Sequence, residues 1–197
     1  RAPYVVEKSA KPWPAVGNQT MWNTSIGWRM TNPALPKPWT ISNGEAAEKT
    51  AREWGISREA QDAFAVRSHD LAAAAWAAGA YDAEIVQVPG HELARDEGIR
   101  DGSTVEKLAG LKPLFAEDGT VTAANSSSIT DGASAVLLGA GGALPPEPLA
   151  RIIGRAAHGV APDVFPTAPM EAANTALARA GKAWADVAFV ARHEACA

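Results

Sequence analysis

The strongest constraint on the fold is a strand, helix, strand pattern near the end of the chain. Ala150–Gly154 and Val187–Val190 are short apolar segments with β-branched residues, which predict two strands. Between them, Thr167 has the side chain of a helix N-cap, and Gly181 follows the expected helix end. Roughly 30 residues separate the strands, enough for the right-handed crossover that joins parallel strands. The sequence therefore predicts an α/β fold that contains a β-α-β unit.

Two longer helices are predicted in the first half of the chain. Glu45–Trp54 is rich in good helix formers, and Gly55 suits the left-handed conformation that ends many helices. Ser57 offers the N-cap of a second helix, whose apolar positions continue through Phe64 as far as Gly79. This second segment is the longest helix that the sequence predicts.

Shorter elements are predicted between residues 80 and 140. Ile85–Val88 has the β-branched content of a strand, and the uninterrupted apolar residues of Ser134–Gly139 are typical of a buried strand. Ser103 and Glu106 have the spacing of a capping box, which predicts a short helix. Asp118 and the glycine after it indicate a turn.

Residues 1–42 show neither helical nor strand periodicity, and prolines and tryptophans punctuate them throughout. A solvated linker seldom carries large apolar rings, so we expect a packed loop or flap whose core lies elsewhere in the fold. The segment 141–149, rich in glycine and proline, is predicted to be a linker. It would separate a first region, residues 1–140, from a second region, residues 150–197.

Composition excludes several classes of protein. The formal net charge is -4 and the basic residues are scattered, so no nucleic acid partner is expected. No apolar run approaches the roughly 20 residues of a spanning helix, and residues 1–10 lack a secretion signal, so we expect a cytoplasmic protein without a membrane partner. Cys196 is the only cysteine, which excludes an intramolecular disulfide. His69, His91 and His158 have no metal-ligand spacing, so no metal is expected, and His69 should face solvent or cap a neighbour.

Three collinear blocks of the sequence are similar to one enzyme family. Gly44–Glu48 with Trp54–His69 matches the pattern GETAEN followed by GISRExQDxFAxRSH. Glu106–Ala135 matches EKLAxLKPxFxxDGTVTAGNASGxNDGAAA, and Ala180–Ala197 ends in a match to ELNEAFA or EFHEAFS. In these blocks the chain resembles the thiolases, the enzymes that form or cleave β-ketoacyl-CoA. A weaker likeness at residues 24–33 points to the thiolases of aromatic-acid degradation.

The resemblance implies a thiolase-like α/β fold with two related halves. The chain would hold the loop domain that covers CoA, mostly residues 1–125, then the end of the N-terminal half and the start of the C-terminal half. It would be an internal portion only. The nucleophilic cysteine in its CxSG motif would precede residue 1, and the GHP histidine and CxGG cysteine would follow residue 197. The missing initiator Met leads to the same expectation of absent flanks, although a processed subunit with trimmed ends would look alike.

The resemblance also implies candidate site residues. His193 takes the place of a family asparagine that holds an oxyanion-hole water, and a histidine satisfied by backbone groups is the alternative. Ser127 and Asn125 match a turn where thiolases contact CoA, with a simple polar turn as the alternative. Ser42 lies where many thiolases have a residue beside the acyl pocket. Cys196 aligns with the Phe of the NEAF motif, which favours core packing over catalysis.

Two functions of different classes remain. The first is an acyl-CoA C-acyltransferase that forms or cleaves β-ketoacyl-CoA, with CoA and acyl-CoA as substrates, no bound cofactor, and a homodimeric or homotetrameric assembly. This segment alone would be inactive, with Glu194 orienting its neighbours rather than transferring protons. The second is a truncated, non-catalytic chain that binds acyl-CoA or pairs with a complementing thiolase subunit. Acyl-chain specificity and the favoured direction of reaction stay open.

Overall fold

A computed structural model of the chain describes residues 4–8, 13, 16–25, 27–28, 30–93, 95–130, 134–141 and 148–197. These residues form two compact units, Arg1–Asn43 and Gly44–Ala197. The predicted linker at 141–149 falls largely outside the described residues, as does the Asp131–Ala133 part of the second thiolase-like block. The division into regions at 141–149 therefore stays a prediction.

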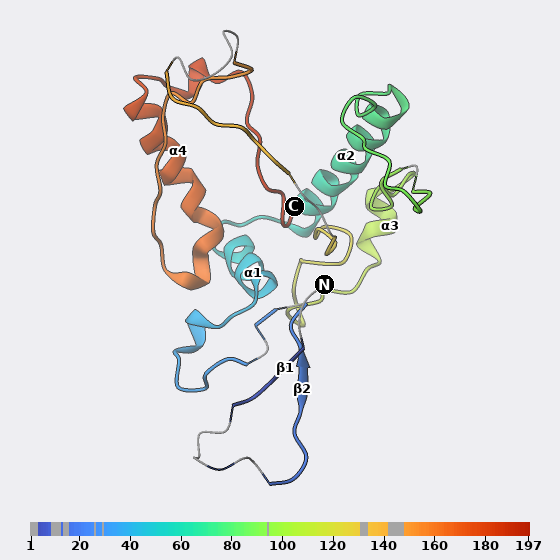
Figure 1. Cartoon of the computed structure of the whole chain (residues 1–197), viewed down its shortest axis with the longest axis vertical. Coiled ribbons are helices and arrows are strands. Elements are labelled where there is room, and N and C mark those ends of the chain that lie inside the picture. Colours follow the sequence, from blue (N-terminus) through green and yellow to red (C-terminus); the bar gives the residue numbers. More distant parts are fainter. Residues whose placement is uncertain are drawn as a thin grey trace. The chain divides into compact units, whose positions relative to one another are not determined.

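The N-terminal unit contains a short antiparallel hairpin (Figure 1). Strands β1 (Tyr4–Val6) and β2 (Met21–Asn23) pair so that Val5 lies opposite Trp22. This hairpin has no periodic signal in the sequence, because strands of three residues are too short to produce one. Trp13 and Trp28 are 79% and 61% exposed, and the packing of this segment on a core elsewhere in the fold stays a prediction. A short 3-10 helix, Lys37–Trp39, follows the hairpin.

The two predicted long helices are confirmed. Helix α1 spans Asn43–Glu53 and α2 spans Arg58–Ala77 (Figure 1). Gly55 between them has a φ of 64°, the left-handed conformation in which glycine avoids a Cβ clash. The Ser57 hydroxyl accepts a hydrogen bond from the Ala60 backbone N–H at 3.2 Å, so it caps α2 as expected.

The predicted short helix is present, but its cap is displaced by one residue. Helix α3 spans Val105–Ala109, and Thr104 rather than Ser103 accepts the capping hydrogen bond, from the Lys107 backbone N–H at 3.3 Å. Ser103 instead donates its hydroxyl to the Arg100 carbonyl at 2.8 Å. Two adjacent hydroxyl residues give the same sequence signal, and the backbone geometry decides between them.

Helix α4 spans Ala168–Arg179, after a 3-10 segment at Pro162–Thr167, and a further 3-10 turn spans Trp184–Asp186. Gly181 has a φ of 64° just beyond the end of α4, as predicted. Thr167 occupies the N-cap position but makes no capping bond, because its hydroxyl donates to the Val164 carbonyl at 2.9 Å. The expectation of a Thr167 side-chain cap is therefore wrong.

The four strands predicted in the C-terminal unit are wrong. Ile85–Val88, Ser134–Gly139, Ala150–Gly154 and Val187–Val190 form no ladder with any part of the chain that the structure describes. Their apolar side chains are exposed, with Leu137 83%, Ile152 71% and Phe189 79% exposed. A strand exists only where a neighbouring backbone pairs with it, and no described segment takes that place. The β-α-β unit is thus present as its helix alone.

The core of the C-terminal unit is small and mixed in polarity. Its buried apolar residues come from the helices and from the loop after α3: Ala46, Ala51, Ala65, Leu108 and Val121. As many polar residues are buried beside them: Glu48, Gln61, Asp62, Thr122 and Asn125. None of the helices in the described ranges is both long and apolar enough to cross a membrane.

Candidate functional site

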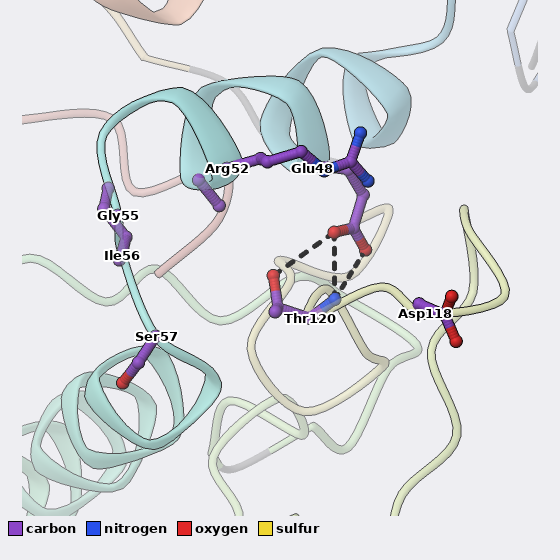
Figure 2. A pocket seen from close by; sticks show the side chains of 8 residues that line it. Glu48, Arg52, Gly55, Ile56, Ser57, Asp118 and Thr120 are labelled. Carbon is purple, nitrogen blue, oxygen red and sulfur yellow. Dashed lines mark hydrogen bonds between the residues drawn. The ribbon is translucent and has the colours of Figure 1, made fainter.

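The loop at residues 118–122 is held by a buried carboxylate on α1. Glu48 is 5% exposed, and both of its oxygens accept the Thr120 backbone N–H at 2.9 Å. Its Oε1 also accepts the Val121 N–H at 2.8 Å. Figure 2 shows Glu48 reaching from α1 to Thr120, with Arg52, Ser57 and Asp118 around a cavity of about 250 Å³. Both carboxylate oxygens already accept hydrogen bonds from this loop. We therefore infer that Glu48 has a structural role and that this cavity is not the functional site.

A second set of polar contacts joins α2 and α3 to the same loop. Arg58 donates from Nε to Asp62 at 2.7 Å and from Nη2 to the Leu108 carbonyl at 2.6 Å. Asp62 in turn accepts the Asn125 side-chain amide at 3.1 Å. Buried polar groups need such partners, because an unpaired one costs free energy of folding. The position of Asn125 is therefore fixed from α2.

The Asn125 side chain is fully engaged within the protein. Its Nδ2 also donates to the Thr120 carbonyl at 2.9 Å, and its Oδ1 accepts the Thr122 N–H at 2.7 Å. The residue is 3% exposed. The buried Asn125 side chain thus stabilises the conformation of the turn through its hydrogen bonds. A direct contact between Asn125 and CoA stays a prediction.

The end of the chain runs beside this turn. The Ser127 N–H donates to the Ala195 carbonyl at 3.0 Å, and the Ala197 N–H donates to the Asn125 carbonyl at 2.9 Å. Between these bonds, Ser126 and Cys196 form an antiparallel bridge. Two segments about 70 residues apart in sequence, both singled out for the site, are thus joined through their backbones.

A cavity of about 210 Å³ opens where these segments meet α2. It is lined by Phe64, Ala65, Ser68, His69, Ala124, Asn125, Ser126, Ser127, Glu194 and Ala197. Ser127 is exposed and lines the cavity, as a ligand contact requires. His193 is exposed next to a lining residue, and its imidazole has no hydrogen bond to any residue within the described ranges. Ser42 is exposed in the N-terminal unit.

Sequence reasoning missed the contribution of α2 to this cavity. Phe64 and Ser68, like Ala65 and His69, are four residues apart, and this helical spacing could have indicated that they share one face. His69 caps a neighbour as expected, because its Nδ1 accepts the Arg100 backbone N–H at 3.4 Å. The role of Glu48 was not predicted either, because a glutamate on a helix is usually exposed to solvent and the sequence does not show that this one is buried.

Comparison with known proteins decides the family. The family model described as "Thiolase, N-terminal domain" matches residues 30–141, more than half of the chain. The chain belongs to the thiolase family. The family and the thiolase-like α/β fold expected from the sequence are thus confirmed.

The individual relatives match most or all of this chain, but the match covers only about half of their own length. Over 207 residues the chain is 39% identical to the beta-ketoadipyl-CoA thiolase of Pseudomonas putida, covering 100% of this chain and 51% of that relative. It is 38% identical to the 3-ketoacyl-CoA thiolase of Bacillus subtilis, over 93% of this chain and 53% of the relative. The crystal structure of the Bacillus anthracis acetyl-CoA acetyltransferase superposes with a TM-score of 0.72 and 30% identity, covering 94% of this chain and 48% of that one. The chain spans about half the length of the curated relatives that it matches.

The thiol of this thiolase-family chain is not activated by its surroundings. Cys196 is partly buried, and this burial raises the pKa of its thiol above the ordinary value. The Glu48 charge adds to this rise in the Cys196 pKa, and the nearby Ser126 hydroxyl opposes it. The buried Ser126 oxygen has no hydrogen bond to a nitrogen or oxygen of the described residues. A protonated thiol at neutral pH is a poor nucleophile. Within the described ranges, no three His, Cys, Asp or Glu side chains cluster as metal ligands, and the metal-free site stays an expectation.

Proposed function

We propose that this chain is the CoA-facing middle portion of a thiolase that forms or cleaves β-ketoacyl-CoA with CoA. One observation carries the proposal: the Asn125–Ser127 turn is hydrogen-bonded to the Ala195–Ala197 segment at the edge of one cavity. Both segments carry thiolase-like motifs. Their pairing would set a CoA-binding hydroxyl and an oxyanion donor at a common site.

Each candidate residue then has a defined role. Ser127 would bond to CoA through its exposed hydroxyl, and Asn125 would hold the turn that presents it. His193 would help to stabilise the developing negative charge, since a donor aimed at an oxyanion lowers the barrier. Ser42 would contribute beside the acyl group. The acyl-carrying thiolate and the base are expected from the parts of a thiolase that this chain does not span.

The relatives suggest which substrate to test first. Among the relatives named for β-ketoadipyl-CoA or 3-oxoadipyl-CoA are the beta-ketoadipyl-CoA thiolase of Pseudomonas putida and the 3-oxoadipyl-CoA/3-oxo-5,6-dehydrosuberyl-CoA thiolase of Escherichia coli, the latter 36% identical to this chain. We extend this class to the present protein, with simple β-ketoacyl-CoA thioesters of fatty acid metabolism as the comparison. The proposal includes a homodimer or homotetramer in the cytoplasm and no bound cofactor.

The first experiment is the intact mass of the polypeptide from its full reading frame, followed by thiolysis of β-ketoadipyl-CoA and acetoacetyl-CoA by that polypeptide. We expect a mass near twice 20.5 kDa and CoA-dependent cleavage of at least one substrate. A polypeptide of that size without thiolysis or condensation activity would refute the proposal.

The CoA contact has a matched pair of variants. Ser127→Ala removes a hydroxyl that lines the cavity, whereas Ser128→Ala removes one outside its lining. We expect Ser127→Ala to raise the KM for CoA about three-fold to ten-fold with little change in kcat, because one hydrogen bond to bound CoA is lost. Equal KM values for the two variants would contradict the role of Ser127.

The second candidate is a non-catalytic chain that pairs with a complementing thiolase subunit. The exposed apolar residues Val136, Leu137 and Leu138 favour it, because such a run is normally covered by another surface. A natural polypeptide of only 20.5 kDa that co-purifies with a second thiolase chain would support this candidate. A monodisperse 20.5 kDa monomer would count against it.

A further inference from the structure

Both neighbours of His193 in sequence are anchored to one face of α2. The Arg192 guanidinium lies 4.6 Å from the centre of the Phe64 ring, within the range of a cation-π contact. The Ser68 hydroxyl donates to Glu194 Oε2 at 3.1 Å. Phe64 and Ser68 are four residues apart, so they lie one above the other on the helix.

The backbone at Glu194 needs such support. Glu194 has a φ of 51°, and it is the one non-glycine residue with a positive φ among those that the structure describes. A side chain in the left-handed region is sterically unfavourable, and it persists where surrounding contacts impose it. Here the Ser68 hydroxyl holds the Glu194 carboxylate from one side, while the Ser127 N–H holds the next carbonyl, that of Ala195, from the other.

These contacts constrain the chain around His193 and leave its ring free. The imidazole is exposed, and the structure gives it no hydrogen bond to a described residue. A donor that stabilises an oxyanion acts best when its position is fixed before the reaction, because reorganisation then adds nothing to the barrier. An arrangement that fixes both flanks of a residue without engaging its side chain meets this requirement.

We propose that Ser68 is a positioning residue of the thiolase site, which with Phe64 clasps the Arg192–Glu194 segment and so aims His193 at the reacting carbonyl. This inference rests on the proposed function. It adds a residue of α2, outside the turn and the chain end, to the machinery of the site. Ser68 acts through Glu194 and touches no reacting atom.

The kinetic test compares Ser68→Ala, Ser68→Thr and Asp70→Ala in the full-length enzyme. Asp70 is the matched control, because it is an exposed residue on the same helix outside the cavity lining. We expect Ser68→Ala to lower kcat about five-fold to ten-fold with the KM for CoA changed less than about two-fold. Ser68→Thr should recover most of the rate, since it keeps the hydroxyl. Equal rates for Ser68→Ala and Asp70→Ala, or no recovery by Ser68→Thr, would overturn the proposal.

A second measurement does not depend on activity. Hydrogen exchange of the peptide covering residues 192–197 should be several-fold faster in Ser68→Ala than in the wild type, because the Ala197 N–H belongs to the supported segment. Asp70→Ala should leave this exchange unchanged. Unchanged exchange in Ser68→Ala would overturn the clasp even in an active enzyme. A wild type that lacks thiolase activity would refute the proposed function instead, and faster exchange in Ser68→Ala would still support the clasp.

Discussion

Glu48 offers the sharpest test of how the site is ordered. Its carboxylate accepts the Thr120 N–H with both oxygens and the Val121 N–H with Oε1, and the Thr120 hydroxyl also reaches Oε2 at 3.2 Å. Glu48→Ala would leave two backbone donors near the core without acceptors. Each unsatisfied buried donor costs about 1–3 kcal/mol, and removing the buried carboxylate returns part of its desolvation cost. We therefore expect Glu48→Ala to lower the free energy of unfolding by about 2–4 kcal/mol.

Glu48→Gln refines the prediction. The amide keeps one acceptor oxygen but turns an NH₂ group toward the Thr120 N–H, so we expect a loss of about 1–2 kcal/mol. Glu53→Gln is the control, because Glu53 lies on the same helix, is exposed, and forms an ion pair with Lys49 at 3.6 Å. An exposed pair contributes less than about 1 kcal/mol.

The assay is reversible urea unfolding of the full-length protein, followed by tryptophan fluorescence at fixed protein concentration. The expected order of stability is wild type, then Glu53→Gln, then Glu48→Gln, then Glu48→Ala. A Glu48→Ala variant within about 0.5 kcal/mol of the wild type would refute the reasoning, because a change of that size is typical of surface positions.

Three further predictions follow from single contacts. The Lys49 ammonium beside Asp163 holds the pKa of that carboxyl below its ordinary value. The ion pair therefore contributes its full stabilisation above about pH 4, and this contribution is lost as the pH falls through the lowered pKa of the folded state. Melting curves should thus show Asp163→Asn approaching the wild type only in acid, and a gap that is constant with pH would contradict this. Because burial raises the pKa of Cys196, its peptide should be alkylated more slowly in the folded protein than in urea at the same pH, and equal rates would contradict this. Arg58→Leu leaves the 1% exposed Asp62 without its cation and should cost about 3–5 kcal/mol in urea unfolding, whereas a loss below about 1 kcal/mol would rule out a buried ion pair.

The helices could be predicted from the sequence because their signals are local. Ser57 and Gly55 fix the start of α2 and the end of α1 through contacts within a few residues. Where the signal was ambiguous, as at Ser103 and Thr104, the error was a single residue. Thr167 shows the limit of this reasoning, since its hydroxyl found a carbonyl three residues earlier instead of the helix N-terminus.

The strands could not be predicted in the same way, because a strand depends on a partner far away in sequence. The apolar composition of Ser134–Gly139 and Val187–Val190 says that these segments suit a buried sheet, but not which backbone would pair with them. Tyr4–Val6 and Met21–Asn23 show the reverse case, in which a hairpin forms without a periodic pattern. Composition thus indicated which segments favour extended structure, but it did not show which segments pair. It predicted strands that do not pair, and it did not predict the hairpin that forms.

The candidate site, too, could be predicted only in part from the sequence. The resemblance brought the Asn125–Ser127 turn and the segment around His193 into one proposal, and the backbone bonds between them place these segments side by side. What it could not supply was the support beneath them, which comes from Glu48 and Ser68. Both act through distant hydrogen bonds, since Glu48 lies 73 residues from Val121 and Ser68 lies 126 residues from Glu194.

The nature of that support determines how the site responds to substitution. An apolar core tolerates exchange among side chains of similar volume, because dispersion and burial depend little on direction. The turn at Asn125 is held instead by directional bonds from Asp62, Thr120 and Thr122, so an isosteric change reverses a donor or an acceptor without changing volume. Asp62→Asn and Asn125→Leu each nearly preserve the volume of the side chain. Each nevertheless leaves a buried donor or acceptor of this hydrogen-bond network without its partner. Changes at the helix faces that carry these bonds should therefore alter the site more than changes of equal volume among the alanines packed beside them.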